Sequence, residues 1–482
     1  MQLLKKNIIL FVSTILFIAV NGFLIYQNLY YGIILPFILL IVWFAFVKIE
    51  SLLLIVVFTT PLSVLLSDFI PNTPVDLSIP TEPILAGLLL VYILKITAGQ
   101  SLDKQILKHP VSISIYIYLF WMFFTSISST MPLVSFKFFI ARLWLIVPLF
   151  FMATHFFKNP EYIKKYLWVF IIPFIVVIIY MLTNLISVGL FQKNAAHGAM
   201  RPFFNDHTSY GAIIAMYIPI IVGFLFFKQY NKERKIIISG LLALFLFALV
   251  FSYTRAAWIS ILAAIGVFTV VIFKIDKRLL LVGAIAVVSL FFVFQFEITD
   301  KLSKNRQDSS QDLAEHASSI SNIATDASNL ERINRWNSAF KMFEEKPIFG
   351  FGPGTYMFQY APYQMSYDRT IISTNFGSGG NAHSEYIGPL AESGILGTLT
   401  FLGIIVMTIV TGVKVFYRAQ KREFKILSLV SLLGLVTYYI HGFLNNFLDT
   451  DKASVPFWGF TAIIVAIDVF HETSKQKTRI QE

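Results

Sequence analysis

Long apolar runs dominate the chain, and they predict membrane-spanning helices. Each run is about 16 to 22 residues long, the length that a helix needs to cross roughly 30 Å of hydrocarbon. Short polar loops separate the runs, so we expect an all-α polytopic membrane protein of about fourteen transmembrane helices. The predicted spans lie near residues 7–26, 30–47, 51–67, 82–98, 111–129, 138–156, 166–187, 209–227, 237–253, 256–274, 279–297, 396–413, 426–444 and 456–470.

The distribution of lysine and arginine residues predicts how these helices are oriented. Cytoplasmic loops of membrane proteins carry an excess of both residues. If the N-terminus is cytoplasmic, every second loop should be basic, and the clusters agree: Lys5 and Lys6, Lys104 and Lys108, Lys158 with Lys164 and Lys165, Lys228 to Lys235, Lys277 with Arg278, Lys414 to Lys425, and Lys475 to Arg479. We therefore expect a bacterial inner-membrane protein with both termini in the cytoplasm.

One long polar segment, residues 298–394, interrupts the apolar pattern and falls on the periplasmic side of this topology. Residues 301–329 are Ser-rich and without apolar periodicity, so we expect a loop or a loosely held helix there. The apolar spacing from Leu330 to Phe343 predicts an amphipathic helix on the membrane face, which Pro347 ends. The predicted parts of the chain are residues 1–194 with the N-terminal helices, 195–445 including the loop, and 446–482 with the last helix and a basic tail.

Composition supports the membrane assignment and excludes several kinds of site. The chain is 56% hydrophobic and 13% charged, whereas soluble domains are roughly 25% charged. It contains no cysteine, which excludes disulfides, thiolate metal ligands and cysteine nucleophiles. The net charge of +11 is explained by basic cytoplasmic loops, so we expect no nucleic-acid partner.

Three arginines lie near the outer ends of predicted spans, where a bilayer makes a charge costly. Arg142 lies inside the sixth span, Arg201 just before the eighth, and Arg255 at the hinge between the ninth and the tenth. Guanidinium groups bind phosphate oxygens through paired hydrogen bonds and stay charged when desolvated. The three arginines therefore predict a shared anion site. The alternative is that they extend to the phosphates of membrane lipids.

A second group of polar residues lies at the end of the long loop. His383 can serve as a general base near neutral pH, and Glu385 could orient or assist it. Asp206 and His207 form a rival acid/base pair on the same face. The alternative for His383 is a solvated loop histidine without a role. We expect His441, inside the thirteenth span, to be a hydrogen-bonded packing residue.

Four segments together resemble the O-antigen ligase and polymerase family of bacterial membrane glycosyltransferases. They are Arg201-Pro-Phe-Phe-Asn-Asp-His207, Tyr253-Thr-Arg-Ala-Ala-Trp258, Arg335-Trp-Asn-Ser-Ala-Phe340 through Pro347 to Gly354, and His383 through Gly394. They follow the family's order on the predicted outer face, and with the hydropathy they cover about residues 195 to 445. Two places depart from the family: Ser384 stands where Asn commonly follows the histidine, and Asn205-Asp206-His207 where Asn-Pro-Asn is frequent.

This resemblance implies a metal-independent glycosyltransferase without a cofactor. The donor would be a glycan on an undecaprenyl-diphosphate carrier embedded among the membrane lipids, and the reaction would take place at the periplasmic face. Arg201, Arg255 and Arg142 would bind the diphosphate, and His383, with Glu385, would take the acceptor proton. The expected supporting residues are Asn205, Asp206, His207, Tyr253 and Trp258. The acceptor hydroxyl stays open between a surface glycan, the lipid A core and a protein side chain.

Two other classes of function also stay open. A transporter or flippase of lipid-linked or anionic solutes would explain the many spans and the membrane arginines. It explains less well a large loop on one face and the lack of a visible repeat, since alternating access needs gates on both sides. A structural subunit of a glycan-assembly complex would make the arginines and His383 dispensable for chemistry.

Overall fold

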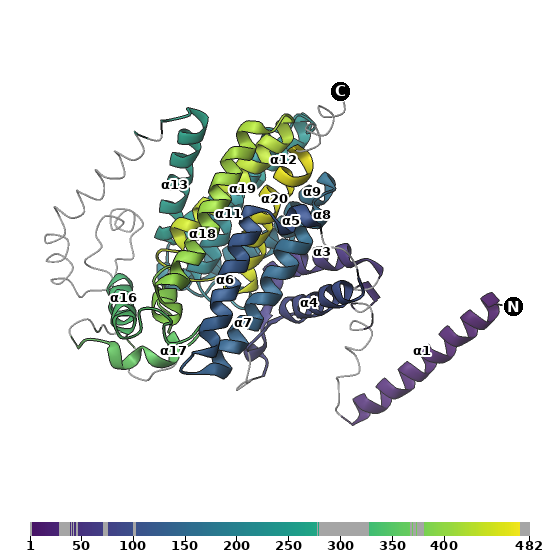
Figure 1. Cartoon of the computed structure of the whole chain (residues 1–482). Coiled ribbons are helices and arrows are strands. Elements are labelled where there is room, and N and C mark those ends of the chain that lie inside the picture. The colour runs from purple at the N-terminus through teal and green to yellow at the C-terminus, as the bar shows by residue number, and fades with distance from the viewer. Residues whose placement is uncertain are drawn as a thin grey trace. The chain divides into compact units, whose positions relative to one another are not determined.

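The computed structural model shows a chain made almost entirely of helices (Figure 1). It describes residues 2–27, 39, 41, 43–44, 47–70, 76–99, 103–276, 278, 327–366, 369, 373 and 380–472. The chain divides into two units, Met1–Ile55 and Val56–Glu482, which are considered separately. The predicted span at 279–297 and nearly all of the one at 30–47 lie outside the described residues, as does most of the segment 301–329.

The first unit contains helix α1 (Gln2–Tyr26) and the beginning of helix α3 (Ile49–Thr59). Two apolar helical stretches, Thr14–Tyr26 and Ile49–Leu62, are shorter than the 18 residues required of a candidate span. The predicted spans near 7–26 and 51–67 are therefore helical, and their crossing of the membrane stays a prediction.

Nine segments of the second unit, counted over the described residues, are long and apolar enough to cross a membrane. They are α6 (Pro110–Ile127), α7 (Pro132–Ile146) continued by η4 (Val147–Met152) and α8 (Ala153–Phe156), α9 (Pro160–Val188), α11 (His207–Leu225), α12 (Lys232–Phe251), α13 (Arg255–Ile272), α18 (Gly388–Arg418), α19 (Arg422–His441), and α20 (Asp451–Ala466) continued by η6 (Ile467–Glu472). The prediction of an all-α membrane protein is confirmed, whereas the total of about fourteen spans stays a prediction.

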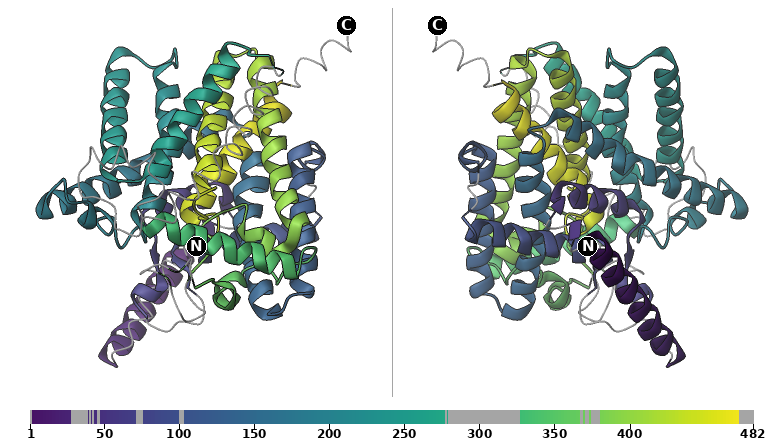
Figure 2. Two further views of the ribbon diagram at one scale, coloured as in Figure 1. Left: turned by 90° about the vertical axis from the view of Figure 1, so that its left-hand side faces the viewer. Right: turned by 90° about the vertical axis from the view of Figure 1, so that its right-hand side faces the viewer.

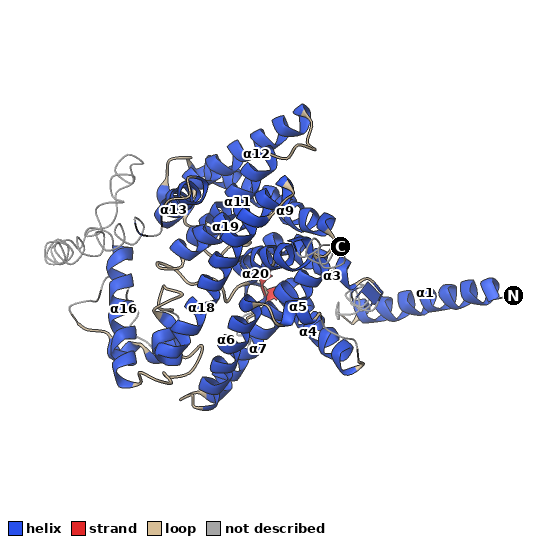
Figure 3. Cartoon of the chain, turned by 45° about the horizontal axis from the view of Figure 1, so that its top comes forward, coloured by secondary structure: helices blue, strands red, loops and turns tan. Residues whose placement is uncertain are grey.

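The remaining elements of the second unit are two longer helices, α4 and α16, and several short helices and strands (Figure 3). They are η2 (Thr60–Leu62), β1 (Val64–Leu65), η3 (Leu66–Asp68), β2 (Ser78–Ile79), α4 (Thr81–Thr97), α5 (Lys104–Leu107), α10 (Lys193–Ala196), α16 (Ala327–Glu345), α17 (Tyr356–Gln359) and η5 (Ala361–Tyr363). The two strands pair antiparallel, with Val64 opposite Ile79. Helix α4 coincides with the predicted span near 82–98 but is 17 residues long.

Polar caps and prolines at the loops explain where several spans begin. The side chain of Asn159 accepts a hydrogen bond from the backbone N–H of Glu161, and Pro160 is the first residue of α9. Asp206 and Asn231 cap α11 and α12 in the same way. Such caps satisfy backbone N–H groups that have no partner within the helix. Short capped loops make consecutive spans antiparallel.

Helix α20 forms the core of the second unit. All of its residues from Asp451 to Ala466 are buried. Its rings pack on neighbouring helices: Phe460 meets Tyr217 of α11 at 5.3 Å between ring centroids, and Trp458 meets Phe150 of η4 at 6.5 Å. Figure 2 shows α20, in yellow, enclosed by other helices of the unit. The last predicted span is therefore a central helix of the bundle, with protein instead of lipid around it.

Loops of the second unit gather at two ends of its bundle. At one end, which we call the cap end, Thr130 N–H donates to the Phe351 carbonyl at 2.9 Å. At the other, which we call the basic end, the Tyr417 hydroxyl donates to the Val271 carbonyl at 2.6 Å. The loops and helix ends of the basic end contain Lys158, Lys164, Lys165, Lys228, Lys232, Arg234, Lys235, Lys274, Lys414, Arg418, Lys421, Arg422 and Lys425. The loops that were predicted to be periplasmic thus lie opposite the basic clusters.

The described residues between Ala327 and Ile387 form what we call the cap, with α16 as its main helix. This helix turns its polar side inward, because Glu331, Asn334, Arg335 and Ser338 are all buried. Phe340, on its apolar side, is 41% exposed. The amphipathic helix expected from the apolar spacing is present. Its buried face combines these polar residues with Ala339 and Met342, and the contact of its outer face with lipid stays a prediction.

Two glycines allow the cap to approach the start of α18 closely. Gly394 has a φ of 66° inside α18, and a Cβ there would lie 2.1 Å from the carbonyl oxygen of Ile348. Gly350 has a φ of 65°, and its Cβ would lie 2.4 Å from the backbone carbon of Glu392. Only glycine tolerates both this conformation and this contact. The first turn of α18 is consequently held against the cap.

Candidate functional site

The loop that carries Arg201 and the turn that carries Arg255 meet at the cap end. The Thr254 hydroxyl donates to the backbone carbonyl of His207 at 2.8 Å. Gly211 permits this approach, since a Cβ there would lie 2.7 Å from the Thr254 hydroxyl oxygen. The beginnings of α11 and α13 are thereby joined, although 47 residues separate the two partners in sequence.

Asp206 and Arg201 shape the loop before α11. The Asp206 carboxylate accepts from the backbone N–H groups of Thr208 and Ser209, both at 2.8 Å. Arg201 donates from Nε to the backbone carbonyl of Asn205 at 2.9 Å. The side chain of Arg201 is exposed, so its guanidinium group is accessible at the cap end. Asn205 thus orients Arg201 through its main chain.

The turn between α12 and α13 presents Arg255 at the start of a helix. Tyr253 has a φ of 50° and is buried, which fixes the direction of the turn. Trp258 donates from its indole N–H to the Leu249 carbonyl at 3.0 Å and so ties α13 to α12. Arg255 itself is partly buried. Tyr253 and Trp258, expected as supporting residues, hold the backbone on both sides of this arginine.

The cap adds Arg332, a cation that the sequence did not point to. Burial lowers the pKa of Arg332 to about 10, with a further lowering by the nearby charge of Arg255 and an opposing contribution from Asp206. Its Nε donates to the Leu444 carbonyl at 3.0 Å. Arg332 therefore lies in the same electrostatic environment as Arg255 and Asp206, and it also contacts the loop between α19 and α20.

His383 belongs to this same environment. Burial lowers the pKa of His383 to about 4, and the positive charges of Arg332 and Arg335 lower it further, whereas Glu331 and Asp206 oppose the shift. The residue also has a φ of 50°, an uncommon conformation for a side chain with a Cβ. A histidine with this pKa is neutral at pH 7 and can accept a proton. We call Arg255, Arg332 and His383 the cationic group.

A buried ion pair supports the cap behind Arg332. Arg335 donates from Nε to Glu331 at 2.7 Å, and its guanidinium carbon lies 3.9 Å from the centroid of the Tyr360 ring. The Tyr356 hydroxyl donates to the Arg335 carbonyl at 2.7 Å. Gly380 makes room for this arginine, since a Cβ there would lie 1.9 Å from its Nη1. Arg335, quoted for the family resemblance, is thus packed inside the cap.

Glu385 has other partners than the histidine two residues before it. One carboxylate oxygen accepts from the Tyr438 hydroxyl at 2.6 Å and from the backbone N–H groups of Phe447 and Leu448 at 2.8 and 2.9 Å. Its own N–H donates to the Gly442 carbonyl at 2.8 Å. Burial and the charge of Asp449 raise its pKa. Glu385 therefore connects the cap to the loop between α19 and α20.

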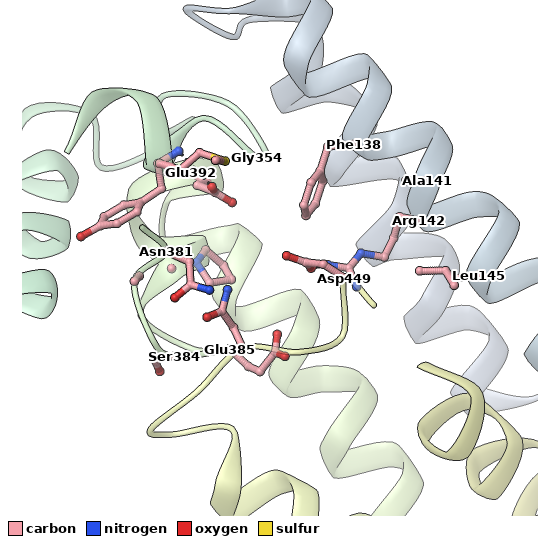
Figure 4. A pocket seen from close by; sticks show the side chains of 16 residues that line it. Phe138, Ala141, Arg142, Leu145, Gly354, Asn381, Ser384, Glu385, Glu392 and Asp449 are labelled. Atoms are coloured by element: carbon pink, nitrogen blue, oxygen red, sulfur yellow. Dashed lines mark hydrogen bonds and ion pairs between the residues drawn. The ribbon is translucent and has the colours of Figure 1, made fainter. Parts of the chain in front are cut away.

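Arg142 lies in a cavity with Glu385. It donates from Nη1 to the Leu448 carbonyl at 2.7 Å and from Nη2 to Asp449 at 2.5 Å, and its guanidinium carbon is 5.0 Å from the Phe138 ring centroid. The cavity has a volume of about 250 Å³ and is lined by Phe138, Arg142, Glu385, Glu392 and Asp449, among others (Figure 4). The structure thus brings Arg255 into one environment with Arg332 and His383, and it places Arg142 in another; Arg201 lies on the loop before α11, whose end contacts Thr254.

The remaining histidines of interest have local partners. His441 is buried, and its Nε2 lies 3.1 Å from the Asn445 amide nitrogen, as expected of a packing residue. His207 stacks on His197, with 4.2 Å between ring centroids. No group of three or more His, Asp or Glu side chains arranged to hold a metal ion occurs among the residues that the structure describes.

The comparison with protein families assigns the middle of the chain. Residues 240–402 match the family model of the O-antigen ligase. This segment is an O-antigen ligase domain. It begins within α12, contains the cap, and ends within α18, so it includes Arg255, Arg332 and His383. No curated protein matches the chain.

The match to the O-antigen ligase model, together with the nine candidate spans of the described residues, supports a multi-pass membrane enzyme of polysaccharide biosynthesis that transfers glycans. Arg142, in α7, and Arg201, in the loop before α11, lie outside the matched segment. One feature of the sequence could have pointed to Arg332. It precedes Arg335 by three residues, so the two side chains are neighbours on the surface of α16. Nothing in the sequence indicated that α16 turns this surface inward.

Proposed function

We propose that this protein is a metal-independent glycosyltransferase of the bacterial inner membrane, acting at the periplasmic face. It takes a glycan from an undecaprenyl-diphosphate carrier and joins it to a hydroxyl of a surface polysaccharide, as a polymerase or a ligase. The O-antigen ligase domain supports glycan transfer in general. The single observation that carries the finer proposal is the position of Arg332, which bonds to the Leu444 carbonyl at 3.0 Å and lies within electrostatic reach of both Arg255 and His383.

The proposed reaction divides the work between these residues. The acceptor oxygen attacks the anomeric carbon of the donor sugar while His383 takes the acceptor's proton. The bond from that carbon to the diphosphate oxygen breaks, and the lipid diphosphate leaves with the electron pair. Arg201, Arg255 and Arg332 stabilise its growing negative charge, which is the task of a divalent cation in other enzymes. Backside attack inverts the configuration of the anomeric carbon.

The charges at the two ends of the bundle support a location of the proposed site at the periplasmic face. The cationic group lies at the cap end, and the lysine and arginine clusters of the loops lie at the basic end. Cytoplasmic loops carry such clusters, so the basic end would face the cytoplasm, where the C-terminus would also lie. The donor diphosphate would sit at headgroup level on the outer side.

The acceptor stays open within the proposal. A growing glycan, the lipid A core and a protein hydroxyl all require the same base and leaving-group site. We favour a glycan or lipid-core acceptor, and a protein O-oligosaccharyltransferase is the alternative. A transporter of lipid-linked solutes is the competing class, and an enzymatic assay separates it from the transferase.

The test uses the full-length protein in nanodiscs with an undecaprenyl-diphosphate-linked oligosaccharide and candidate acceptors. Lipid diphosphate release and glycan transfer are measured for the wild type, Arg255→Ala and His383→Ala. The matched controls are Arg234→Ala and His155→Ala, since both residues are exposed at the basic end. We expect transfer in the wild type and both controls, and its loss in both site variants.

Two results would overturn the proposal. One is movement of the lipid-linked oligosaccharide across a proteoliposome membrane without release of lipid diphosphate, which would identify a transporter. The other is full transfer activity in Arg255→Ala and His383→Ala, which would leave the chemistry to other residues.

A further inference from the structure

The cavity beside Arg142 is chemically unlike the cationic group. Three carboxylates, those of Glu385, Glu392 and Asp449, line it together with one guanidinium group. The guanidinium group of Arg142 already donates hydrogen bonds to Asp449 at 2.5 Å and to the Leu448 carbonyl. A diphosphate would therefore meet net negative charge here. The cavity suits a ligand that is neutral or positively charged and donates hydrogen bonds.

Groups of several kinds converge on this space. Figure 4 shows the Phe138 ring and the side chains of Asn381, Glu392 and Asp449 pointing towards one another. Glu392 accepts a hydrogen bond from the backbone N–H of Tyr356 at 3.1 Å through one carboxylate oxygen. The side chain of Asp449 is 44% exposed. An aromatic ring beside a few convergent polar groups is typical of a small-molecule site.

One buried acceptor in the lining of the cavity has no partner among the described residues. The amide oxygen of Asn446, a lining residue, is buried and accepts no hydrogen bond from any residue that the structure describes. A buried acceptor without a partner costs about 1 to 3 kcal/mol, so such atoms usually have a partner in the working state. A hydroxyl-rich ligand would supply one.

The position of the cavity relative to His383 narrows the choice of ligand. Asn381, Ala382 and Ser384 line it, whereas His383 itself is influenced by Arg332 and Asp206. Residues on both sides of His383 in the chain thus line the cavity, whereas His383 belongs to the cationic group. In the proposed reaction the donor sugar is bonded to the diphosphate and must lie at the cationic group. The second substrate has to reach the base from elsewhere.

We propose that this cavity binds a sugar residue of the acceptor, an inference that rests on the proposed glycosyl transfer. Hydroxyl groups of the sugar donate to Glu392, Asp449 and the Asn446 oxygen, and one face of the ring packs on Phe138. The volume of about 250 Å³ is below the roughly 300 to 1,000 Å³ of drug-sized sites, so the cavity takes one small polar unit. Its charge selects neutral and amino sugars against uronic acids.

A binding experiment tests the charge selection without any need for turnover. Methyl glucoside, methyl glucosaminide and methyl glucuronide are compared by saturation-transfer NMR on the full-length protein in nanodiscs. The wild type should bind the glucuronide least, and Glu392→Gln should reduce this discrimination. Glutamine keeps an acceptor for the Tyr356 N–H, and Glu344→Gln, on the exposed end of α16, is the matched control. Equal or tighter binding of the glucuronide by the wild type would overturn the inference.

Transfer kinetics provide the second test. Glu392→Gln and Phe138→Ala should each raise the KM for a saccharide acceptor by about tenfold, the loss expected for one good contact, with a smaller change in the KM for the donor. Phe358→Ala, an exposed residue of α17, is the control for the aromatic variant. Unchanged acceptor KM in both variants, with wild-type transfer intact, would refute the cavity and leave the proposed function standing. Sugar binding that Glu392→Gln alters, without any transfer, would support the cavity and refute the proposed function.

Discussion

The cationic group and the cavity beside Arg142 lie at the same end of one bundle, yet their charges are opposite. The first combines Arg255 and Arg332 with a histidine that burial and these charges keep neutral. The second surrounds a single, paired arginine with three carboxylates. An enzyme that joins an anionic donor to a hydroxyl acceptor has to keep the two substrates in separate places. Opposite local charge is a simple physical means of doing so.

The largest expected effect comes from removing the proposed base. His383→Ala should lower the rate of transfer by about 10² to 10⁴, the usual contribution of general base catalysis. Donor affinity should change little, because the arginines remain. The measurement is the rate of lipid diphosphate release together with a donor-binding isotherm. A variant that retains more than a tenth of the wild-type rate would remove His383 from the chemistry.

Replacing one arginine of each region by alanine should distinguish a role in donor binding from a role in the stability of the fold. Arg332→Ala is expected to lower kcat/KM for the donor by about 10² to 10³, as for other groups that stabilise a developing charge. Arg142→Ala should lower the melting temperature, because it removes two hydrogen bonds, to Asp449 and to the Leu448 carbonyl, and leaves that carbonyl with the Ser454 hydroxyl alone. Donor titrations and thermal unfolding of both variants in nanodiscs make the comparison. Equal loss of donor affinity in both variants would mean that Arg142 also binds the diphosphate, as the sequence predicted.

The pH profile should report the charge around His383. Its pKa is lowered from 6.5 to about 4, so the base is neutral above that range and is lost as the pH falls through it. We expect the acidic limb of kcat/KM to lie below pH 6.5 and to move upward in Arg332→Ala, since one lowering charge is removed. The limb of kcat should lie higher than that of kcat/KM, because bound diphosphate offsets the arginine charges. An acidic limb that Arg332→Ala leaves in place would contradict the coupling.

The smallest expected effect concerns Glu385, which adjoins His383 in sequence but bonds to Tyr438 and to the loop between α19 and α20. Glu385→Gln should lower the free energy of unfolding by about 1.5 to 3 kcal/mol, as for a hydrogen bond to a charged group. It should leave the acidic limb of the pH profile unchanged. Chemical denaturation and the pH profile measure the two effects. A shifted limb would support the sequence-based expectation that Glu385 orients the histidine.

Hydropathy and charge spacing predicted much of this protein because both act locally or along one helix. The apolar runs predicted each of the nine candidate spans in the described residues. The spacing from Leu330 to Phe343 predicted α16, which ends at Glu345, just before Pro347. Residues such as Arg255 and His383 could be singled out because a charged or ionisable side chain next to a bilayer has a high free-energy cost and is therefore rare.

The sequence by itself determined the nine candidate spans of the described residues, since hydrocarbon tolerates little but helices along so apolar a chain, and its motifs indicated the O-antigen ligase family. Only the tertiary structure decided which face of α16 points inward, and hence that Arg332 joins Arg255 and His383. It also decided that Arg142 pairs with Asp449, 307 residues away, and that Glu385 turns to Tyr438. These choices depend on how helices distant in sequence pack at one end of the bundle. Contacts of that kind arise from three-dimensional packing, and the periodicity of a single helix does not predict them.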